Sequence, residues 1–242
     1  MNKKPAGWTL ITGGAKRLGA ILCTTLAKQG HSIVVHYNNS REEALQVVGK
    51  CRALGVAAEC IQGDLSSTEA TADFIKRYLN QFPKTTTLIN NVGNYLIKPA
   101  STTTSEEWLS LFQTNLHAPT SIIQALLPSL KKHQGRIVNI GTAGVQWLSA
   151  RTYTPAYYIT KTSLWMLTKS LATELGPFGV TINMVSPGIL NNTVDPPKDM
   201  TLIPMRRMGA PEEVARVVAF LLEEGSGYIT GQNIDVAGGI RL

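Results

Sequence analysis

The chain has 242 residues, of which 43% are hydrophobic and 16% are charged, and its formal net charge is +7. This composition is typical of a soluble protein that can bury a full core. No apolar run reaches about 18 residues, and the first residues are polar and lead directly into strand-like sequence. We therefore expect no membrane span, no signal peptide and a cytoplasmic location, with no membrane partner.

The positive charge favours anionic ligands such as phosphorylated cofactors or an acidic carrier protein. Lys and Arg form no runs along the chain, which argues against a nucleic-acid partner. The three cysteines, Cys23, Cys51 and Cys60, lie in or beside apolar segments and lack the spacing of metal ligands. We expect reduced core thiols and no metal site.

Short β-branched segments alternate with longer stretches of helical periodicity almost from end to end. Strands are expected at Trp8–Thr12, Ser32–Tyr37, Ala57–Gln62, Thr87–Asn90, Arg136–Ile140, Val180–Val185 and Asn233–Val236. Helices are expected at Leu18–Gln29, Arg41–Leu54, Thr68–Gln81, Ser105–Lys132 (broken near Thr114 or Asn115), Pro155–Leu175 and Pro211–Leu222. Most of the strand segments are apolar without alternation, as expected when both faces of a parallel sheet are covered.

This alternation predicts the α/β class, with a doubly wound, seven-stranded parallel sheet and helices on both faces. No linker or repeat divides the sequence, so residues 1–242 are expected to form a single domain. The interval Gly188–Gly209 contains Pro196, Pro197 and Pro204 and is expected to be a long exposed loop that binds substrate.

A glycine-rich turn, Thr12-Gly-Gly-Ala-Lys-Arg-Leu-Gly19, follows the first strand and leads into a helix. Backbone N–H groups in such a turn can approach a pyrophosphate at the positive end of the helix. The turn is not a Walker loop, because no Gly-Lys-Ser/Thr closes it. The residues expected to bind the cofactor here are Gly13, Lys16, Arg17, Leu18 and Gly19.

The second strand ends about 20 residues beyond this turn, where proteins that select NAD commonly place an acidic residue. Here no Asp or Glu occurs before Glu42. Hydrogen-bond donors suited to a 2′-phosphate occur instead, which favours NADPH or NADP⁺ over NADH. These donors are His36, Asn38, Asn39 and Ser40, with Arg17 and Arg41 beside them. Asn38-Asn39-Ser40 could also be a plain turn that caps the next helix.

Tyr157 and Lys161 are four residues apart at the start of a helix-periodic run, which puts a phenol and an amine on one helix face. A cation beside a phenol favours the phenolate and lowers the tyrosine pKa. The pair can therefore act as an acid/base, although the same spacing also occurs in ordinary surface pairs.

Taken together, the motifs resemble those of the short-chain dehydrogenase/reductase family over essentially the full length of the chain, and they imply a Rossmann fold. The motifs are Thr12-Gly…Gly19, Asp64-Leu65, Asn90-Asn-Val-Gly93, Asn115, Gly141-Thr142, Tyr157-x-x-x-Lys161, Ser186-Pro-Gly188 and Tyr228-Ile-Thr-Gly231. Two positions depart from the family pattern. Arg17 stands where the family turn usually has glycine, and Gly144 stands where the catalytic serine is expected.

The resemblance implies that Tyr157 donates a proton to a substrate carbonyl while nicotinamide delivers hydride. It implies that Lys161 holds the nicotinamide ribose and lowers the tyrosine pKa, and that Asn115 holds a water leading to Lys161. Alignment on Arg136–Ile140 makes Thr142 the substitute for the family serine, with an insertion in Trp147–Thr154; Ser149 is the alternative. Asn115 could also be simply a residue that breaks or caps a helix.

Further cofactor contacts follow from the same resemblance. Asp64 and Leu65 are expected near the adenine, although Asp64 could simply end a strand. Asn90, Asn91 and Gly93 are expected to line the cofactor trough. Pro187 and Gly188 are expected to contact the carboxamide end.

The overall pattern resembles 3-oxoacyl-carrier-protein reductases most closely, so the expected partner is a small-molecule carbonyl, presented on an acyl carrier protein or free. Pteridine reductases are the alternative, and a catalytically silent NADPH-binding sensor is an alternative of another class. The resemblance implies a homotetramer or homodimer. An acidic carrier could be attracted by Lys131, Lys132, Arg136 and Lys169, although such residues are often ordinary solvated surface.

Overall fold

A computed structural model describes residues 7–193 and 199–241, and within them seven parallel strands form the central layer. The strands are β1 (Trp8–Ile11), β2 (Ser32–Tyr37), β3 (Ala58–Gln62), β4 (Thr85–Asn90), β5 (Arg136–Ile140), β6 (Thr181–Pro187) and β7 (Asn233–Val236). Their order in the sheet is β3-β2-β1-β4-β5-β6-β7, and every neighbouring pair is parallel. The order reverses between β1 and β4, which is where ligands bind in doubly wound sheets.

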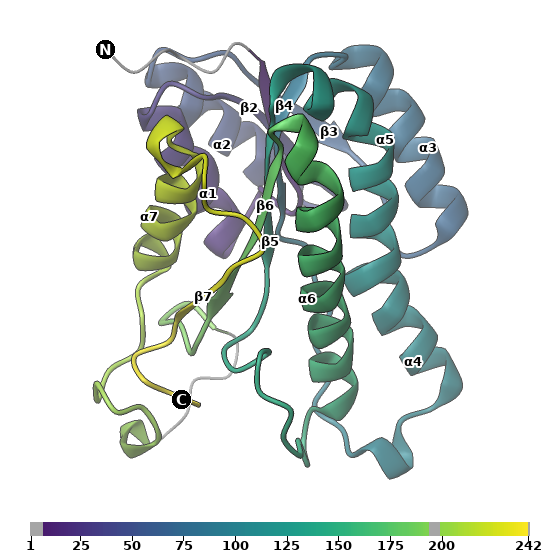
Figure 1. Ribbon diagram of the computed structural model, residues 1–242, viewed down its shortest axis with the longest axis vertical. Coiled ribbons are helices and arrows are strands. Elements are labelled where there is room, and N and C mark those ends of the chain that lie inside the picture. The colour runs from purple at the N-terminus through teal and green to yellow at the C-terminus, as the bar shows by residue number, and fades with distance from the viewer. Residues whose placement is uncertain (1–6, 194–198, 242) are drawn as a thin grey trace.

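Helices cover both faces of this sheet (Figure 1). One face carries α1 (Arg17–Lys28), α2 (Arg41–Ala53) and α7 (Pro211–Leu222). The other carries α3 (Thr68–Gln81), α4 (Ser105–Phe112), α5 (Ala118–His133) and α6 (Pro155–Leu175). Short 3-10 turns lie at Ala100–Thr102, Gly176–Phe178, Met200–Leu202 and Glu224–Ser226, and a π-helical turn lies at Gln113–His117.

Successive strand residues enter two separate cores, because side chains of a strand point alternately to its two faces. Ile33 and Val35 of β2 pack with α1, α2 and α7, whereas Val34 packs with α3 and α5. Both faces are buried, and the expectation of unbroken apolar strands for a parallel sheet is confirmed.

The predicted elements are all present, and their ends differ by at most two residues. The long helix expected over Ser105–Lys132 is interrupted where the sequence predicted, since the π-helical turn Gln113–His117 contains Thr114 and Asn115. In the loop expected at 188–209, Leu190 forms a parallel bridge with Gly209. Residues 194–198, with Pro196 and Pro197, lie outside the described residues.

Among the described helices, none combines the length and the apolar character that a membrane crossing requires.

Candidate active site

The carboxyl ends of β1, β4, β5 and β6 meet at one edge of the sheet, and the candidate residues follow these ends. The first group is the turn between β1 and α1. Gly13 has a φ of 62°, and a β-carbon added to Gly19 would lie 2.0 Å from the carbonyl oxygen of Gly13. No side chain fits there, so the turn requires glycine at these two positions.

Asn91 supports this turn from the end of β4. Its Nδ2 donates to the carbonyl oxygens of Thr12 (2.9 Å) and Gly13 (3.2 Å), and the backbone N of Asn91 donates to Oγ1 of Thr12 (2.9 Å). Asn91 therefore fixes the shape of the turn. Lys16, the N-cap of α1, makes no side-chain cap hydrogen bond, so the side chain leaves the first N–H groups of this helix to other acceptors.

The interpretation of His36 as a phosphate donor is wrong. His36 is only 2% exposed, its Nδ1 accepts from the backbone N of Gly13 (3.0 Å), and its Nε2 faces the carbonyl oxygen of Gly63 (3.1 Å). Burial lowers the pKa of His36 to about 4, so the ring is neutral near pH 7. Both ring nitrogens of His36 face backbone groups, so this buried side chain stabilises the glycine-rich turn between β1 and α1.

The other predicted donors lie at the surface. Asn39 is exposed, and Ser40, the N-cap of α2, makes no side-chain cap hydrogen bond. Asn38 accepts from Gln62 Nε2 (3.2 Å) and its Nδ2 lies 3.5 Å from Oδ1 of Asp64. Lys16 forms an exposed ion pair with Glu43 (2.8 Å).

Asp64 organises the turn after β3. Its carboxylate accepts from the backbone N and the Oγ of Ser66, both at 2.9 Å, as a residue that ends a strand does. The side chain of Leu65 is 5% exposed and packs in the core.

Asn90 does not line a trough, contrary to the expectation. It is 2% exposed, and its Nδ2 donates to Oδ1 of Asn139 on β5 (2.9 Å), whose own Nδ2 donates to Thr168 on α6 (2.9 Å). This amide chain is part of the core and links β4, β5 and α6.

Tyr157 lies in the first turn of α6 with its ring edge-on to Tyr95, at a centroid distance of 4.7 Å. Burial raises the pKa of Tyr157 to about 12, and a hydrogen bond with Thr142 and the positive charge of Arg241 oppose that shift. Thr142 thus reaches the phenol, whereas Ser149 is exposed in the inserted loop. The geometry favours Thr142 over Ser149 as the partner hydroxyl.

Lys161 lies one turn further along α6 and is 3% exposed. Its Nζ donates to the carbonyl oxygen of Ile140 at the end of β5 (2.8 Å), and burial lowers its pKa to about 8. The expectation that the pKa of Tyr157 lies below that of a free phenol is not met, because burial of the phenol dominates and raises it.

Asn115 is fully buried in the π-helical turn between α4 and α5. Its Oδ1 accepts from the backbone N of Asn94 (2.7 Å), and its Nδ2 donates to the Asn94 carbonyl and to Thr160 Oγ1, both at 3.0 Å. Asn115 thereby ties the segment after β4 to α6, next to Lys161.

Pro187 and Gly188 end β6 beside the strand β7. Gly188 donates to the carbonyl oxygen of Val236 (3.0 Å), and a β-carbon at Gly188 would lie 2.8 Å from Cα of Ala237. The carbonyl of Pro187 accepts from the backbone N of Ala143 (3.0 Å), which joins this end of β6 to the residues around Thr142.

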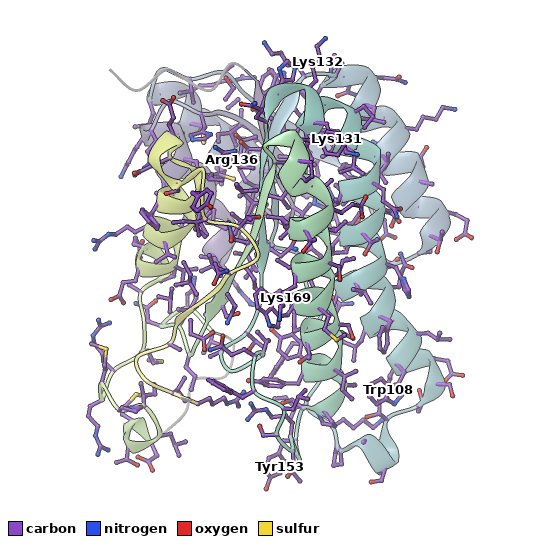
Figure 2. All side chains as sticks on the ribbon, viewed as in Figure 1. Trp108, Lys131, Lys132, Arg136, Tyr153 and Lys169 are labelled. Carbon is purple, nitrogen blue, oxygen red and sulfur yellow. The ribbon has the colours of Figure 1, made fainter. Side chains whose placement is uncertain are left out.

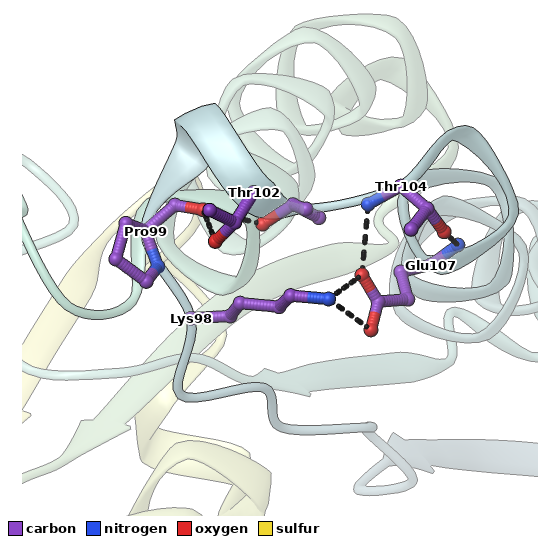
Figure 3. Close-up of polar contacts among 6 residues, drawn as sticks. Lys98, Pro99, Thr102, Thr104 and Glu107 are labelled. Carbon is purple, nitrogen blue, oxygen red and sulfur yellow. Dashed lines mark hydrogen bonds and ion pairs between the residues drawn. The ribbon is translucent and has the colours of Figure 1, made fainter.

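The segment that carries Tyr95 is fixed at the start of α4 (Figure 3). Thr104 and Glu107 form a capping box with N–H donors at 2.8 and 3.3 Å, and Lys98 donates to both oxygens of Glu107 at 2.9 and 2.8 Å. The backbone N of Lys98 also donates to the carbonyl of Tyr153 (2.7 Å), so this segment holds the inserted loop as well.

Sequence reasoning missed three residues at this site: Tyr95, Arg151 and Arg241. The guanidinium carbons of Arg151 and Arg241 lie 4.5 and 4.6 Å from the ring centre of Tyr158. Arg151 lies in the inserted loop just before Tyr157, and this position could have indicated that it belongs to the site. Arg241 gives no local signal, because its contacts are made with residues far away in the sequence.

A pocket of about 360 Å³ adjoins the inserted loop. Its lining does not include Tyr157 or Thr142, so it is a neighbour of the catalytic group. The lining residues are Trp147, Leu148, Ser149, Ala150, Arg151, Pro155, Tyr158, Ile159, Thr162 and Ser163.

The suggested attraction of a carrier by lysines is not supported near this site. Figure 2 shows Lys131, Lys132 and Arg136 at the end of the molecule opposite to Tyr153 of the inserted loop. Lys131 also lies over the Phe178 ring at 4.0 Å, and Arg136 donates to the carbonyl oxygen of Gln134 (2.8 Å). The Lys131 and Arg136 side chains are thus occupied by local contacts.

Comparison with known proteins agrees with this arrangement. The profile of a family described as enoyl-(acyl carrier protein) reductase matches residues 13–241. The putative oxidoreductase YtkK of Bacillus subtilis is 32% identical over 96% of this chain and 96% of its own. The 3-oxoacyl-(acyl-carrier-protein) reductase FabG of Staphylococcus epidermidis is 32% identical, with 100% of both chains covered.

Solved structures of other proteins have the same fold. The crystal structure of a blue fluorescent protein from a metagenomic library, in complex with NADPH, superposes with a TM-score of 0.91 and 28% identity over 98% of both chains. Sequence match and fold agree, and the protein belongs to the short-chain dehydrogenase/reductase family of oxidoreductases, which use NAD(P)H.

Proposed function

We propose that this protein is an NADPH-dependent reductase that converts a carbonyl group into an alcohol. The observation that carries the proposal is the position of Tyr157 in the first turn of α6, one helical turn from the buried amine of Lys161. Thr142 lies near enough to oppose the rise in the pKa of the phenol. A phenol and a hydroxyl aimed at one place can protonate and stabilise an oxygen on which negative charge develops.

The residues present fit a dinucleotide. The tight turn at Gly13 and Gly19 keeps side chains away from the start of α1, and the Lys16 side chain does not cap the first N–H groups of that helix. These N–H groups suit a pyrophosphate, and the exposed side chains of Lys16 and Arg17 add positive charge beside it. In this role the ion pair between Lys16 and Glu43 would have to loosen.

The surface after β2 supports the choice of NADPH. Asn38, Asn39 and Ser40 offer neutral donors, Arg41 follows them, and no acidic residue occurs between β2 and Glu42. A 2′-phosphate is stabilised by such donors, whereas a carboxylate at this place would repel it. Because His36 is buried, the proposed preference for NADPH over NADH rests on Arg17 and on the surface residues 38–41.

When bound, the cofactor supplies the hydride that reduces the carbonyl carbon. Tyr157 supplies the proton to the carbonyl oxygen, because a phenol whose pKa is about 12 is fully protonated at neutral pH and is available as an acid. Thr142 holds the same oxygen in place by a hydrogen bond. We propose these two residues as the groups that contact the reacting carbonyl.

Lys161 would hold the ribose hydroxyls of the cofactor next to Tyr157. Its pKa of about 8 leaves most of the amine charged at neutral pH, and the carbonyl oxygen of Ile140 fixes its direction. Asn115 would support this arrangement through its hydrogen bonds to Asn94 and Thr160. We also propose that Asn115 holds a water leading to Lys161.

The proposed substrate class is a 3-oxoacyl thioester, free or presented on an acyl carrier protein. The support is the full-length relationship to a protein named as a 3-oxoacyl-carrier-protein reductase and the net charge of +7, which favours an acidic carrier. We further propose a cytoplasmic homodimer or homotetramer. Exposed apolar side chains on two helices, Leu109 (70% exposed) and Met166 (66% exposed), support association.

The test is consumption of NADPH by purified protein with a panel of an acetoacetyl thioester, simple diketones and a dihydropterin. Turnover of the thioester above the other substrates supports the proposal. Preferential turnover of dihydropterin would make the protein a pteridine reductase. Tight NADPH binding without turnover of any substrate would make it a sensor.

A further inference from the structure

Two arginines that are distant in the sequence meet beside the catalytic tyrosine. Arg151 comes from the inserted loop before α6, and Arg241 follows β7 near the end of the chain. Their guanidinium carbons lie 4.5 and 4.6 Å from the ring centre of the same residue, Tyr158. The Tyr158 and Tyr157 rings are in edge-to-face contact at 5.9 Å, so only one aromatic ring separates this pair of cations from the proposed proton donor.

Gly144 allows the two arginines to approach. Nη2 of Arg151 lies 3.5 Å from the Gly144 carbonyl oxygen, and a β-carbon at Gly144 would lie 3.1 Å from both Nη2 of Arg151 and Cβ of Arg241. Gly144 has a φ of 79°, a conformation that favours glycine.

Within residues 7–193 and 199–241, neither guanidinium forms an ion pair with a carboxylate. The oxygens of Asp235 accept from Gly144 N (3.2 Å) and Asn233 Nδ2 (2.9 Å). Arg151 lowers the pKa of Arg241 by repulsion, in addition to the larger effect of burial.

Arg151 is partly buried and Arg241 is exposed, and two cations beside one aromatic ring favour an anion near them. The N-terminus of the 21-residue helix α6 adds its positive end here, and the helix has no acidic residue in its first turn. Arg151 and Tyr158 both line the pocket of about 360 Å³, whereas Arg241 and Tyr157 do not belong to its lining.

We propose that Arg151 and Arg241 form a carboxylate-binding subsite and that the enzyme also reduces free oxo acids, whose carboxylate binds this pair while their carbonyl meets Tyr157. This inference rests on the proposed reductase function and adds a second substrate class to the 3-oxoacyl thioesters. The carboxylate takes no part in the chemistry. The π bond of the C=O group breaks and a C–O single bond remains. A new C–H bond forms with the hydride and its electron pair from the nicotinamide cofactor, and a new O–H bond forms with the proton from Tyr157.

The first test measures binding without turnover. Hexanoate and its uncharged counterpart hexanamide are titrated calorimetrically into the enzyme with NADP⁺. Hexanoate should bind at least about tenfold more tightly than hexanamide, as expected for a charge-assisted pair. The double variant Arg151→Gln/Arg241→Gln should lose this difference, whereas Arg216→Gln on α7, which also removes one positive charge, should keep it.

The second test measures turnover of 3-oxohexanoate, 4-oxohexanoate and 5-oxohexanoate and their methyl esters. At least one acid should exceed its ester in kcat/KM by about tenfold or more, and Arg241→Gln should reduce kcat/KM for that acid about tenfold while changing that of the ester less than about twofold. Arg241→Lys should restore part of the loss. Equal binding of hexanoate and hexanamide overturns the subsite, whatever the turnover.

The two proposals can fail separately. Carboxylate binding that depends on both arginines, without turnover of any carbonyl compound, leaves the subsite standing and refutes the reductase function. Turnover of thioesters together with equal rates for acids and esters leaves the reductase function standing and refutes the subsite as a substrate site.

Discussion

Gly93 and Lys161 are packed so closely that a β-carbon at position 93 would lie 3.0 Å from Nζ of Lys161 and 3.4 Å from Oδ1 of Asn115. Glycine at the end of β4 therefore leaves the space in which the buried amine lies. Because Lys161 is also bonded to Ile140 at 2.8 Å, it has little freedom to move aside.

Gly93→Ala should consequently lower kcat about tenfold, since a displaced amine no longer supports the geometry around Tyr157. The measurement is steady-state reduction at saturating NADPH. Gly225→Ala is the matched control, because a β-carbon at Gly225 has no neighbour within 4 Å. Equal kcat for both variants would mean that the position of Lys161 does not matter for turnover.

Lys161→Met should raise the melting temperature at pH 7 and abolish reduction. Burial lowers the pKa of this amine from 10.5 to about 8, so the folded protein binds the Lys161 proton more weakly than the unfolded chain does. At pH 7 the buried charge therefore lowers the stability of the wild-type protein. Between about pH 8 and 10.5 the unfolded chain binds more protons than the folded protein. As the pH rises through this range, the stability of the wild-type protein should therefore increase relative to that of Lys161→Met. The check is thermal unfolding of both proteins across this range; a less stable methionine variant at pH 7 would contradict the expectation.

The stability of the fold should fall as the pH decreases from about 6.5 to about 4. Burial lowers the pKa of both His31 and His36 from 6.5 to about 4, so in this window the unfolded chain binds protons that the folded protein does not. His36→Gln should weaken this dependence in chemical unfolding curves, and His133→Gln on α5 serves as the control. An unchanged pH dependence in His36→Gln would show that His36 is not a neutral buried group.

Cofactor preference should respond to Asn39, which is exposed after β2. Asn39→Asp places a carboxylate near the proposed 2′-phosphate and should shift the ratio of kcat/KM for NADPH over NADH toward NADH by about tenfold. Asn80→Asp makes the same change of charge on α3 and should leave the ratio unchanged. A constant ratio in Asn39→Asp would remove this surface from the cofactor site.

The order and type of the secondary elements could be predicted because they follow local patterns. Apolar runs such as Ser32–Tyr37 are too short for helices, and the break at Thr114 and Asn115 falls where polar residues interrupt an apolar helix. The proximity of Tyr157, Lys161 and Thr142 also follows from the sequence, since the first two share a helix face and the third ends a neighbouring strand.

Directions of individual side chains could not be predicted in the same way. His36 and Asn90 occupy positions that suit a ligand, but tertiary contacts turn both into the core, to Gly63 and Asn139. Arg241 contacts Tyr158 across a long sequence separation, which no local pattern reports. The pKa of Tyr157 depends mainly on its burial. The sequence indicates that an amine lies nearby, but it does not indicate how deeply the phenol is buried.

Replacement of Tyr157 by phenylalanine tests the central claim most directly, with NADPH binding and a single turnover measured on the same preparation. The ring and its contact with Tyr95 are retained, while the proton donor is lost. We predict an NADPH dissociation constant within about twofold of the wild type and a reduction rate lowered by about 100-fold or more, as loss of a general acid requires. A Tyr157→Phe enzyme that reduces its substrate within about tenfold of the wild-type rate would contradict the account.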